Sequence, residues 1–168
     1  SGAPRDPPGT PGPAAPRDTA PAGTAADTSA GVTSADTLAA REGLSAYLET
    51  GRAGDYATMA ALYGGARDSL PLQLVEARDT ISVAGFFREA CTAGQLLCRL
   101  GLLRVLNARP VPPDTLRFRV ELADSTGARF VMGPWCGEEE GDTVTSFVYD
   151  VLKTRNGCRV LTLPVYVP

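Results

Sequence analysis

The sequence predicts an α+β domain in which three N-terminal helices pack on a curved, mostly antiparallel sheet, a cone-like α+β barrel. Up to about residue 93, apolar residues recur at helical spacing, whereas after Gly101 they alternate with polar residues at the period of a strand. The order is a third observation, because helices come first and at least five strands joined by short turns follow. Segregated helices and strands favour helices packed on one face of one sheet.

Residues 1–34 have a different composition from the rest of the chain. Of these 34 residues, 28 are Pro, Gly, Ala, Thr or Ser, and the only larger aliphatic is Val32. Such a segment cannot bury enough apolar area to offset its chain entropy, so it is predicted to be a flexible tether. The folded domain is therefore expected over residues 35–168.

Each of the three expected helices has a capping residue before it and glycine after it. The expected N-caps are Ser34 or Asp36 for the first helix, Asp55 for the second, and Asp79 or Ser82 for the third. The expected stops are Gly51, Gly64-Gly65 and Gly94.

Period-two alternation is clearest where Leu116, Phe118 and Val120 alternate with arginines that should point outward. The first strand is expected to end before Pro110, and Asn156-Gly157 predicts the last hairpin. Strands are predicted over residues 102–109, 116–122, 130–135, 144–152 and 158–167.

Charge and composition exclude several function classes. The 16 basic and 19 acidic residues give a formal net charge of −3, so we do not expect nucleic-acid binding. No run approaches the ~18–20 apolar residues of a membrane span. The segment CGEEEGD, residues 136–142, lacks the spacing of a calcium loop and is expected to be a solvated loop, so neither a metal nor another cofactor is expected.

Four cysteines, Cys91, Cys98, Cys136 and Cys158, favour disulfide bonds in an exported protein. The favoured pairs are 91–98, across a helix end, and 136–158, between strands; free buried thiols and a metal site are the alternatives. A removed signal peptide or lipoprotein leader would leave a start at Ser1, as would a tag remnant. We therefore expect an extracytoplasmic location in a bacterium, either periplasmic, on the cell surface or secreted, with a lipid anchor possible before Ser1.

Three stretches carry a resemblance to a known family: GRAGDYATMAALY, Phe86-Phe87, and the final SFVYDVLKTRNGCRVLTLPVYV. Over about residues 36–167 the chain resembles the nuclear-transport-factor-2-like superfamily, which includes ketosteroid isomerases and polyketide cyclases. In GCRVL, Cys158 stands where that family often has an aromatic residue. The resemblance implies a curved sheet that wraps a helix layer, a hollow at the open end, and dimerisation through the sheet.

The isomerase branch of that superfamily uses a tyrosine as an oxyanion donor and an aspartate as a base. Tyr47 stands at the position of the donor, whereas Leu70-Pro71 stands near the position of the base and Asp68 is the nearest acid. Proton abstraction needs both groups. As alternatives, Tyr47 is a core residue with its hydroxyl at a rim, and Asp68 is an ordinary loop acid.

Asp150 belongs to the alternate set Val144, Ser146, Val148 and Leu152 of the fourth predicted strand. If that face lines the hollow, Asp150 is a buried acid with a shifted pKa; otherwise it reaches solvent. The candidate pocket residues are Tyr47, Tyr63, Phe86, Trp135 and Asp150.

Three functions follow as hypotheses. The first is a tethered, non-enzymatic accessory domain that binds a small apolar ligand or a protein segment, in the hollow or on the sheet. The second is an isomerase- or cyclase-type enzyme that uses Tyr47 with Asp150 or Asp68. The third is a structural dimerisation domain whose hollow is filled by the chain's own aromatic side chains.

Overall fold

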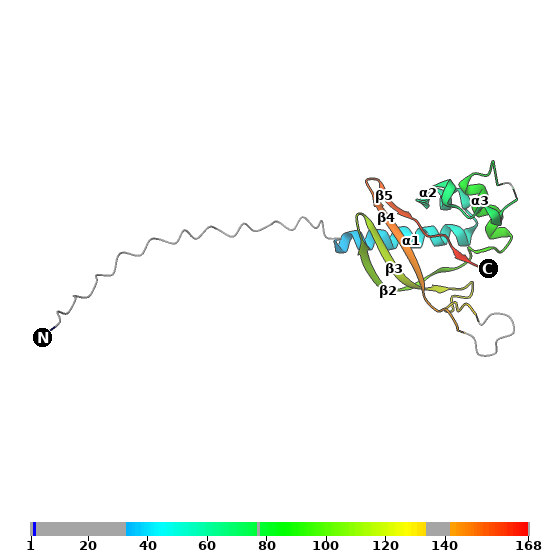
Figure 1. Ribbon diagram of the computed structural model, residues 1–168. Coiled ribbons are helices and arrows are strands. Elements are labelled where there is room, and N and C mark those ends of the chain that lie inside the picture. The colour runs from blue at the N-terminus through cyan, green and yellow to red at the C-terminus, as the bar shows by residue number, and fades with distance from the viewer. Residues whose placement is uncertain (1, 3–32, 77, 134–141, 168) are drawn as a thin grey trace. The chain divides into compact units, whose positions relative to one another are not determined.

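The computed structural model describes residues 33–76, 78–133 and 142–167, together with Gly2. The chain divides into two units, Ser1–Ala30 and Gly31–Pro168, and the described fold lies in the second. Its three α-helices come before its sheets, which confirms the α+β class (Figure 1). None of the helices among these residues is both long enough and apolar enough to cross a membrane.

Helix α1 spans Ser34–Ala53, and one of its two predicted capping residues, Asp36, takes part in its cap. Thr33 is the N-cap, in place of Ser34 or Asp36. The Asp36 N–H donates to Thr33 Oγ1 at 3.1 Å, and the Thr33 N–H donates to Asp36 Oδ2 at 3.1 Å. This reciprocal capping box satisfies two backbone donors that the first turn leaves free.

Gly51 lies inside α1 and does not end it, so the predicted stop is wrong. The helix is closed by Gly54, whose φ of 73° is left-handed and whose N–H donates to the Gly51 carbonyl. A Cβ on Gly51 would lie 2.9 Å from the Cys98 carbonyl oxygen and 3.1 Å from the Met59 methyl carbon. Because Gly51 has no side chain, the backbone at Cys98 can approach α1 closely.

Helix α2, Tyr56–Leu62, begins as predicted, because the Thr58 N–H donates to the side chain of the N-cap Asp55 at 3.1 Å. Two 3₁₀ turns, Arg67–Ser69 and Leu72–Leu74, follow it.

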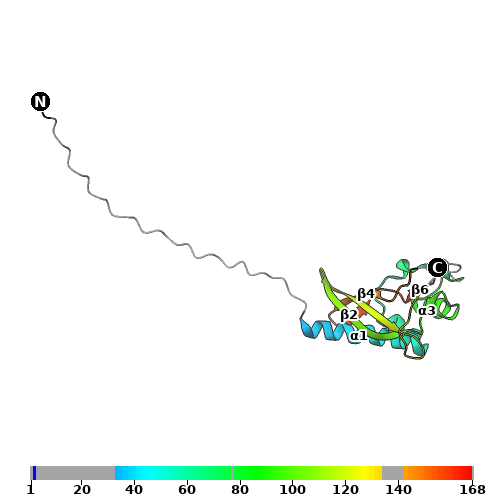
Figure 2. The ribbon, with the colours of Figure 1, turned by 90° about the horizontal axis from the view of Figure 1, so that it is seen from below.

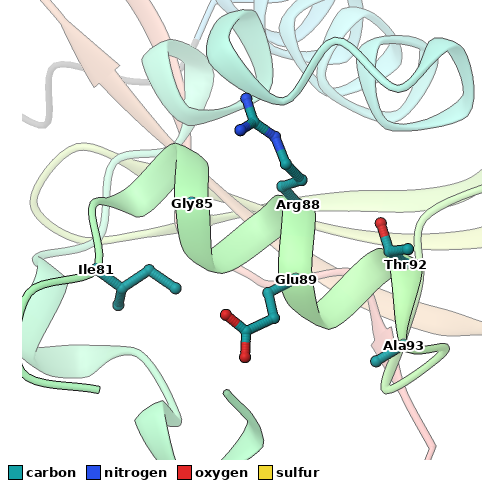
Figure 3. Close-up of a pocket in the computed structure, with 6 residues that line it drawn as sticks. All are labelled: Ile81, Gly85, Arg88, Glu89, Thr92 and Ala93. Carbon is teal, nitrogen blue, oxygen red and sulfur yellow. The ribbon is translucent and has the colours of Figure 1, made fainter. Parts of the chain in front are cut away.

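Helix α3, Val83–Thr92, confirms Ser82 as its N-cap, since the Gly85 N–H donates to Ser82 Oγ at 3.0 Å. Gly94 follows the helix with a φ of 76°. Figure 3 shows α3 with Ile81 before its first turn and Thr92 in its last turn.

The main sheet has four antiparallel strands in the order β2-β3-β4-β5. It is open in the described part of the chain, so the expected closure into a barrel is not observed. Helix α1 lies along one face of this sheet, which we call the inner face (Figures 1 and 2). The strands are β2 Gly101–Val111, β3 Thr115–Ala123, β4 Phe147–Thr154 and β5 Gly157–Val160.

Two proline positions correct the predicted strands. Pro110 lies within β2, which tolerates it because β2 is an edge strand. The strand predicted over 158–167 is interrupted before Pro164, which has no N–H for a ladder. Its end, β6 Val165–Tyr166, pairs with β1 Leu96–Leu97 in a separate two-stranded sheet.

The strand predicted over 130–135 is reduced, in its described part, to isolated bridges. Arg129 pairs with Ala123, and Met132 pairs with Val144. The hairpin predicted at Asn156-Gly157 is confirmed, because β4 and β5 pair up to Thr154 and Gly157.

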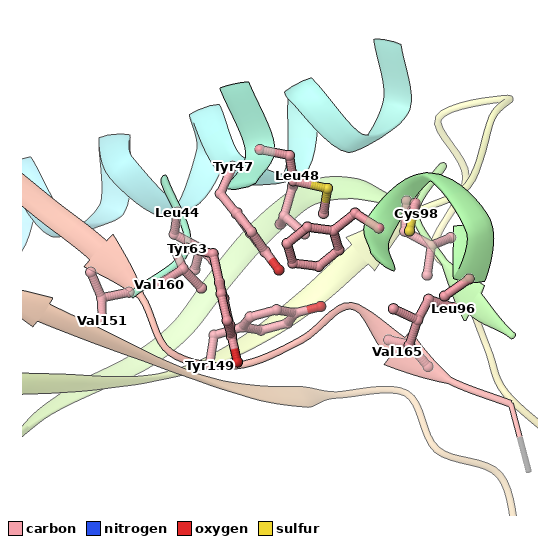
Figure 4. Packing of buried hydrophobic residues seen from close by; sticks show 14 of the residues in the cluster. Leu44, Tyr47, Leu48, Tyr63, Leu96, Cys98, Tyr149, Val151, Val160 and Val165 are labelled. Carbon is pink, nitrogen blue, oxygen red and sulfur yellow. The ribbon is translucent and has the colours of Figure 1, made fainter. Parts of the chain in front are cut away.

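The core lies between α1 and the inner face and is rich in aromatic side chains (Figure 4). Phe87 is at its centre. Its ring meets Tyr47, Tyr63 and Phe86 edge-on, with centroid separations of 6.2, 5.5 and 5.8 Å. Such edge-to-face pairs contribute about 0.5–1.5 kcal/mol each beyond the area that they bury.

Candidate functional site

Tyr47 is a core residue in the structure. Its side chain is 0% exposed, and its hydroxyl has no hydrogen-bond partner among the described residues. Burial, and then the nearby Tyr149 and Tyr63, raise the pKa of Tyr47 well above its usual value. In Figure 4 its hydroxyl points into the aromatic core, towards Tyr149.

The other predicted pocket residues on the helices are also part of this core. Phe86 is 0% exposed and Tyr63, at the end of α2, is 8% exposed. The space between α1 and the inner face is therefore occupied by the chain's own side chains at these positions. Trp135 lies outside the described residues.

Asp150 lies on the outer face of the sheet, opposite to the inner face that packs on α1. The inner residues of β4 are Tyr149 and Val151, whereas Val148 is 50% exposed. Of the two alternatives for the Val148 set, the one in which it lines the hollow is wrong, and the set faces away from the core. Each alternate set of this strand contains apolar residues, and the set with Tyr149 and Val151 faces the core.

Tyr47 and the two candidate acids do not converge. Asp150 pairs with Arg117 across the strands, with Nε–Oδ1 and Nη2–Oδ2 distances of 2.7 Å each. The Asp68 side chain is 94% exposed and lies 3.7 Å from Arg67. The structure thus brings neither carboxylate to the buried hydroxyl.

A disulfide joins Cys91 to Cys98, as predicted, and ties the last turn of α3 to the residue that follows β1. Cys158 makes no disulfide with a described cysteine and lies half-buried against Gly43 of α1. Burial raises the pKa of its thiol. Cys136 lies outside the described residues, so the 136–158 pair stays a prediction.

The part of the chain that the structure describes contains no candidate metal site. No group of three or more Cys, His, Asp or Glu side chains gathers there. Most of the acidic segment 136–142 lies outside it.

Polar side chains gather instead on the outer face of the main sheet. The antiparallel register places Arg109 opposite Arg117, Asn107 opposite Arg119, and Arg104 opposite Glu121. Directly opposed residues share a face of the sheet. The resulting arginine face consists of Arg104, Asn107, Arg109, Arg117, Arg119, Glu121, Val148 and Asp150.

The two carboxylates of the arginine face are already paired. The Glu121 side chain is 7% exposed and lies 2.6 Å from Arg104 Nε and 3.3 Å from Arg129 Nη1. The hydrogen bond from Arg104 lowers the pKa of Glu121 in spite of its burial. Four arginines thus face two carboxylates, which leaves the arginine face with an excess of positive charge.

A groove of about 390 Å³ crosses the arginine face from β2 to β4. Arg119 Nε donates to Ser146 Oγ at 3.0 Å, and Arg117 is held by Asp150. Arg109 is exposed and makes no hydrogen bond or ion pair through its side chain with any described residue. The groove is lined by Asn107, Arg109, Arg117, Arg119, Ser146 and Val148.

The sequence predicts two of the three arginines that line this groove. The alternation around Phe118 predicts outward Arg117 and Arg119, and the half-exposed Arg117 and exposed Arg119 confirm it. Arg109 was missed, because its place opposite Arg117 depends on the strand register, which two irregularities in β2 shift.

A shallow trough of about 690 Å³ runs along α3 (Figure 3). Its polar residues include Glu89, whose carboxylate accepts a hydrogen bond from the Glu76 N–H. In Figure 3, Arg88 points away from Ile81 and Glu89. The trough is lined by Ile81, Gly85, Arg88, Glu89, Thr92 and Ala93.

Comparisons of the chain with protein-family models, with curated proteins and with solved structures find no significant match.

Proposed function

We propose that this protein is a non-enzymatic accessory domain that binds an acidic segment of a protein partner on its arginine face. The observation that carries the proposal is the exposed groove lined by Arg109, Arg117 and Arg119. A guanidinium presents N–H donors in a fork that matches a carboxylate, so such a groove favours side chains of Asp and Glu.

The inner face of the sheet is covered by core side chains, which supports a binding site on the outer face. Tyr47, Phe86 and Phe87 are each 0% exposed, so a ligand there would have to displace core side chains. The structure brings none of the candidate acids among the described residues to the Tyr47 hydroxyl, and an isomerase mechanism needs both a donor and a base.

An extended acidic segment suits the groove better than the other candidate occupants. In a two-fold dimer through this face, arginines would lie near arginines, which is unfavourable. Among the described residues of the arginine face there is no aromatic side chain on which the bases of a single-stranded nucleic acid could stack. The 50% exposed Val148 adds an apolar contact beside the charges.

Location and family membership are further parts of this proposal. The Cys91–Cys98 disulfide supports an extracytoplasmic location, because such bonds persist in oxidising compartments. Three helices followed by an antiparallel sheet, with α1 along one face, support membership of the nuclear-transport-factor-2-like superfamily. Residues 1–34 would then tether the binding domain.

Fluorescence anisotropy with a labelled Glu-rich peptide tests the proposal, with the Gln-for-Glu peptide as the uncharged probe. The double variant R109E/R119E is expected to weaken binding at least tenfold, because it reverses two charges in the groove. The matched variant R41E/R88E reverses two exposed arginines of α1 and α3, and its affinity should stay within about twofold of the parent.

The same measurement identifies the results that would overturn the proposal. Equal losses in the two double variants would mean that the peptide responds only to net charge. Equal binding of the Gln peptide would exclude recognition of carboxylates. A dimer in light scattering that R109E/R119E dissociates would assign the face to a second copy of this chain.

A further inference from the structure

A second cavity, of about 500 Å³, lies beside the Cys91–Cys98 disulfide, and we call it the disulfide pocket. It is distinct from the groove on the arginine face. Arg109 lies eight residues along β2 from Gly101, which is about 26 Å at the ~3.3 Å rise of a strand. The disulfide pocket is lined by Tyr56, Cys91, Thr92, Gly94, Leu96, Leu97, Cys98, Arg99, Leu100, Asp124, Ser125 and Phe130.

The disulfide pocket is apolar below and polar at its mouth. Leu96, Cys98 and Leu100 are buried, with exposed fractions of 2%, 5% and 7%. Tyr56 and Phe130 are partly buried and pack against the core at its sides. Its volume and mainly apolar walls are those of small-molecule sites, which typically measure ~300–1,000 Å³.

Two charged side chains, Asp124 and Arg99, line the mouth. The Asp124 Oδ1 accepts hydrogen bonds from the Thr126 N–H at 2.8 Å, the Thr126 hydroxyl at 2.7 Å and the Ala128 N–H at 3.1 Å. Arg99 is exposed and has no side-chain hydrogen bond or ion pair with a described residue. The hydrogen bonds to Oδ1 hold the Asp124 carboxylate in its own turn, whereas the Arg99 guanidinium has no partner among the described residues and favours an anionic group beside it.

The walls of the disulfide pocket are fixed on two sides. The disulfide ties Cys91, in the last turn of α3, to Cys98. Between them, Leu96 and Leu97 pair with Tyr166 and Val165 of β6. A wall held by both a covalent bond and a ladder loses little conformational freedom when a ligand binds.

We propose that the disulfide pocket binds a small amphipathic carboxylate, with its apolar body against Leu96 and Leu100 and its carboxylate on Arg99. This ligand site is separate from the protein-binding face proposed above, so each of the two proposals can be wrong while the other holds.

Calorimetric titration with decanoate and with decanol tests the assignment, because the two molecules share a chain and differ in charge. The variant R99Q is expected to weaken decanoate binding about tenfold and to leave decanol within about twofold. R155Q, in the exposed turn between β4 and β5, is the matched control and should change neither affinity.

A second pair of variants tests the apolar lining of the disulfide pocket and does not depend on the charge. L97N, in the pocket wall, should weaken both molecules, whereas L38N, at a position that is 55% exposed on α1, should weaken neither. The intact disulfide, verified by mass, and a native circular dichroism spectrum show that each variant is folded.

Three results would overturn the proposal. The first is the absence of saturable decanoate binding to the parent protein. The second is an equal effect of R99Q on decanoate and decanol. The third is equal binding by folded L97N and L38N, which would place the ligand elsewhere.

Discussion

Arg117 and Asp150 face each other across β3 and β4, and both ends of the guanidinium fork contact the carboxylate at 2.7 Å. This pair lies on the outer face of the sheet, away from α1. It places Asp150 away from Tyr47 and offsets one positive charge of the arginine face.

The variant D150N is expected to strengthen binding of the Glu-rich peptide several-fold, because it frees Arg117 for the ligand. It should lower the free energy of unfolding by only about 1 kcal/mol, since the pair is partly exposed to solvent. Anisotropy and urea denaturation measure the two effects. A loss of peptide affinity in folded D150N would contradict this role of Arg117.

Tyr47→Phe removes a buried hydroxyl that has no partner among the described residues. The free energy of unfolding is therefore expected to stay within about 0.5 kcal/mol of the parent or to rise by up to ~1 kcal/mol. Tyr47→Ala, which empties the same space, should lower it by about 3–5 kcal/mol. A loss above about 1 kcal/mol in Tyr47→Phe would show that the hydroxyl has a partner, such as a buried water.

Replacing Cys91 and Cys98 by serine opens a loop with a sequence separation of seven residues. The chain-entropy model then predicts a loss of about 2–3 kcal/mol in the free energy of unfolding. R155Q, in the exposed turn between β4 and β5, is the control and should behave like the parent. If the parent and the double serine variant denatured at the same urea concentration, the disulfide would not stabilise this fold.

Asp36 completes the capping box of α1, and its Oδ1 lies 2.5 Å from Lys153 Nζ of β4. The hydrogen bonds from Lys153 and Thr33 lower the pKa of Asp36 from 3.8 to about 2. Because the folded state holds this proton less tightly than the unfolded state, the contribution is present above pH 4 and is lost as the pH falls towards 2.

Urea denaturation at several pH values between 4 and 2 measures this contribution. D36N should show a smaller loss of stability over that range than the parent. An equal slope in both proteins would contradict the assignment to Asp36.

Local signals in the sequence predict much of the fold. Asp55 and Ser82 cap their helices as expected, since side-chain caps depend on a few neighbouring residues. The sequence predicts a helix stop at Gly51, because it does not show that Met59 and the Cys98 carbonyl approach this residue. It likewise predicts a strand end before Pro110, because the edge position of this residue is known only from the sheet order.

The candidate site was harder to predict than the fold, because it depends on which face of each strand is buried. In β4, Val148 and Val151 belong to opposite faces, so apolar character alone does not distinguish them. The groove requires Arg109 to lie opposite Arg117, although the two belong to different strands. Such long-range register is set by packing and not by local pattern.

The most direct test of the binding face is a ¹⁵N-resolved NMR titration of the protein with the Glu-rich peptide. We predict that amide shifts concentrate on Asn107, Arg109, Arg117, Arg119 and Val148, and that they disappear in R109E/R119E. Shifts centred on Tyr47 and Phe86, or on α3, in place of these strands would contradict the proposal that this domain binds its partner on the arginine face.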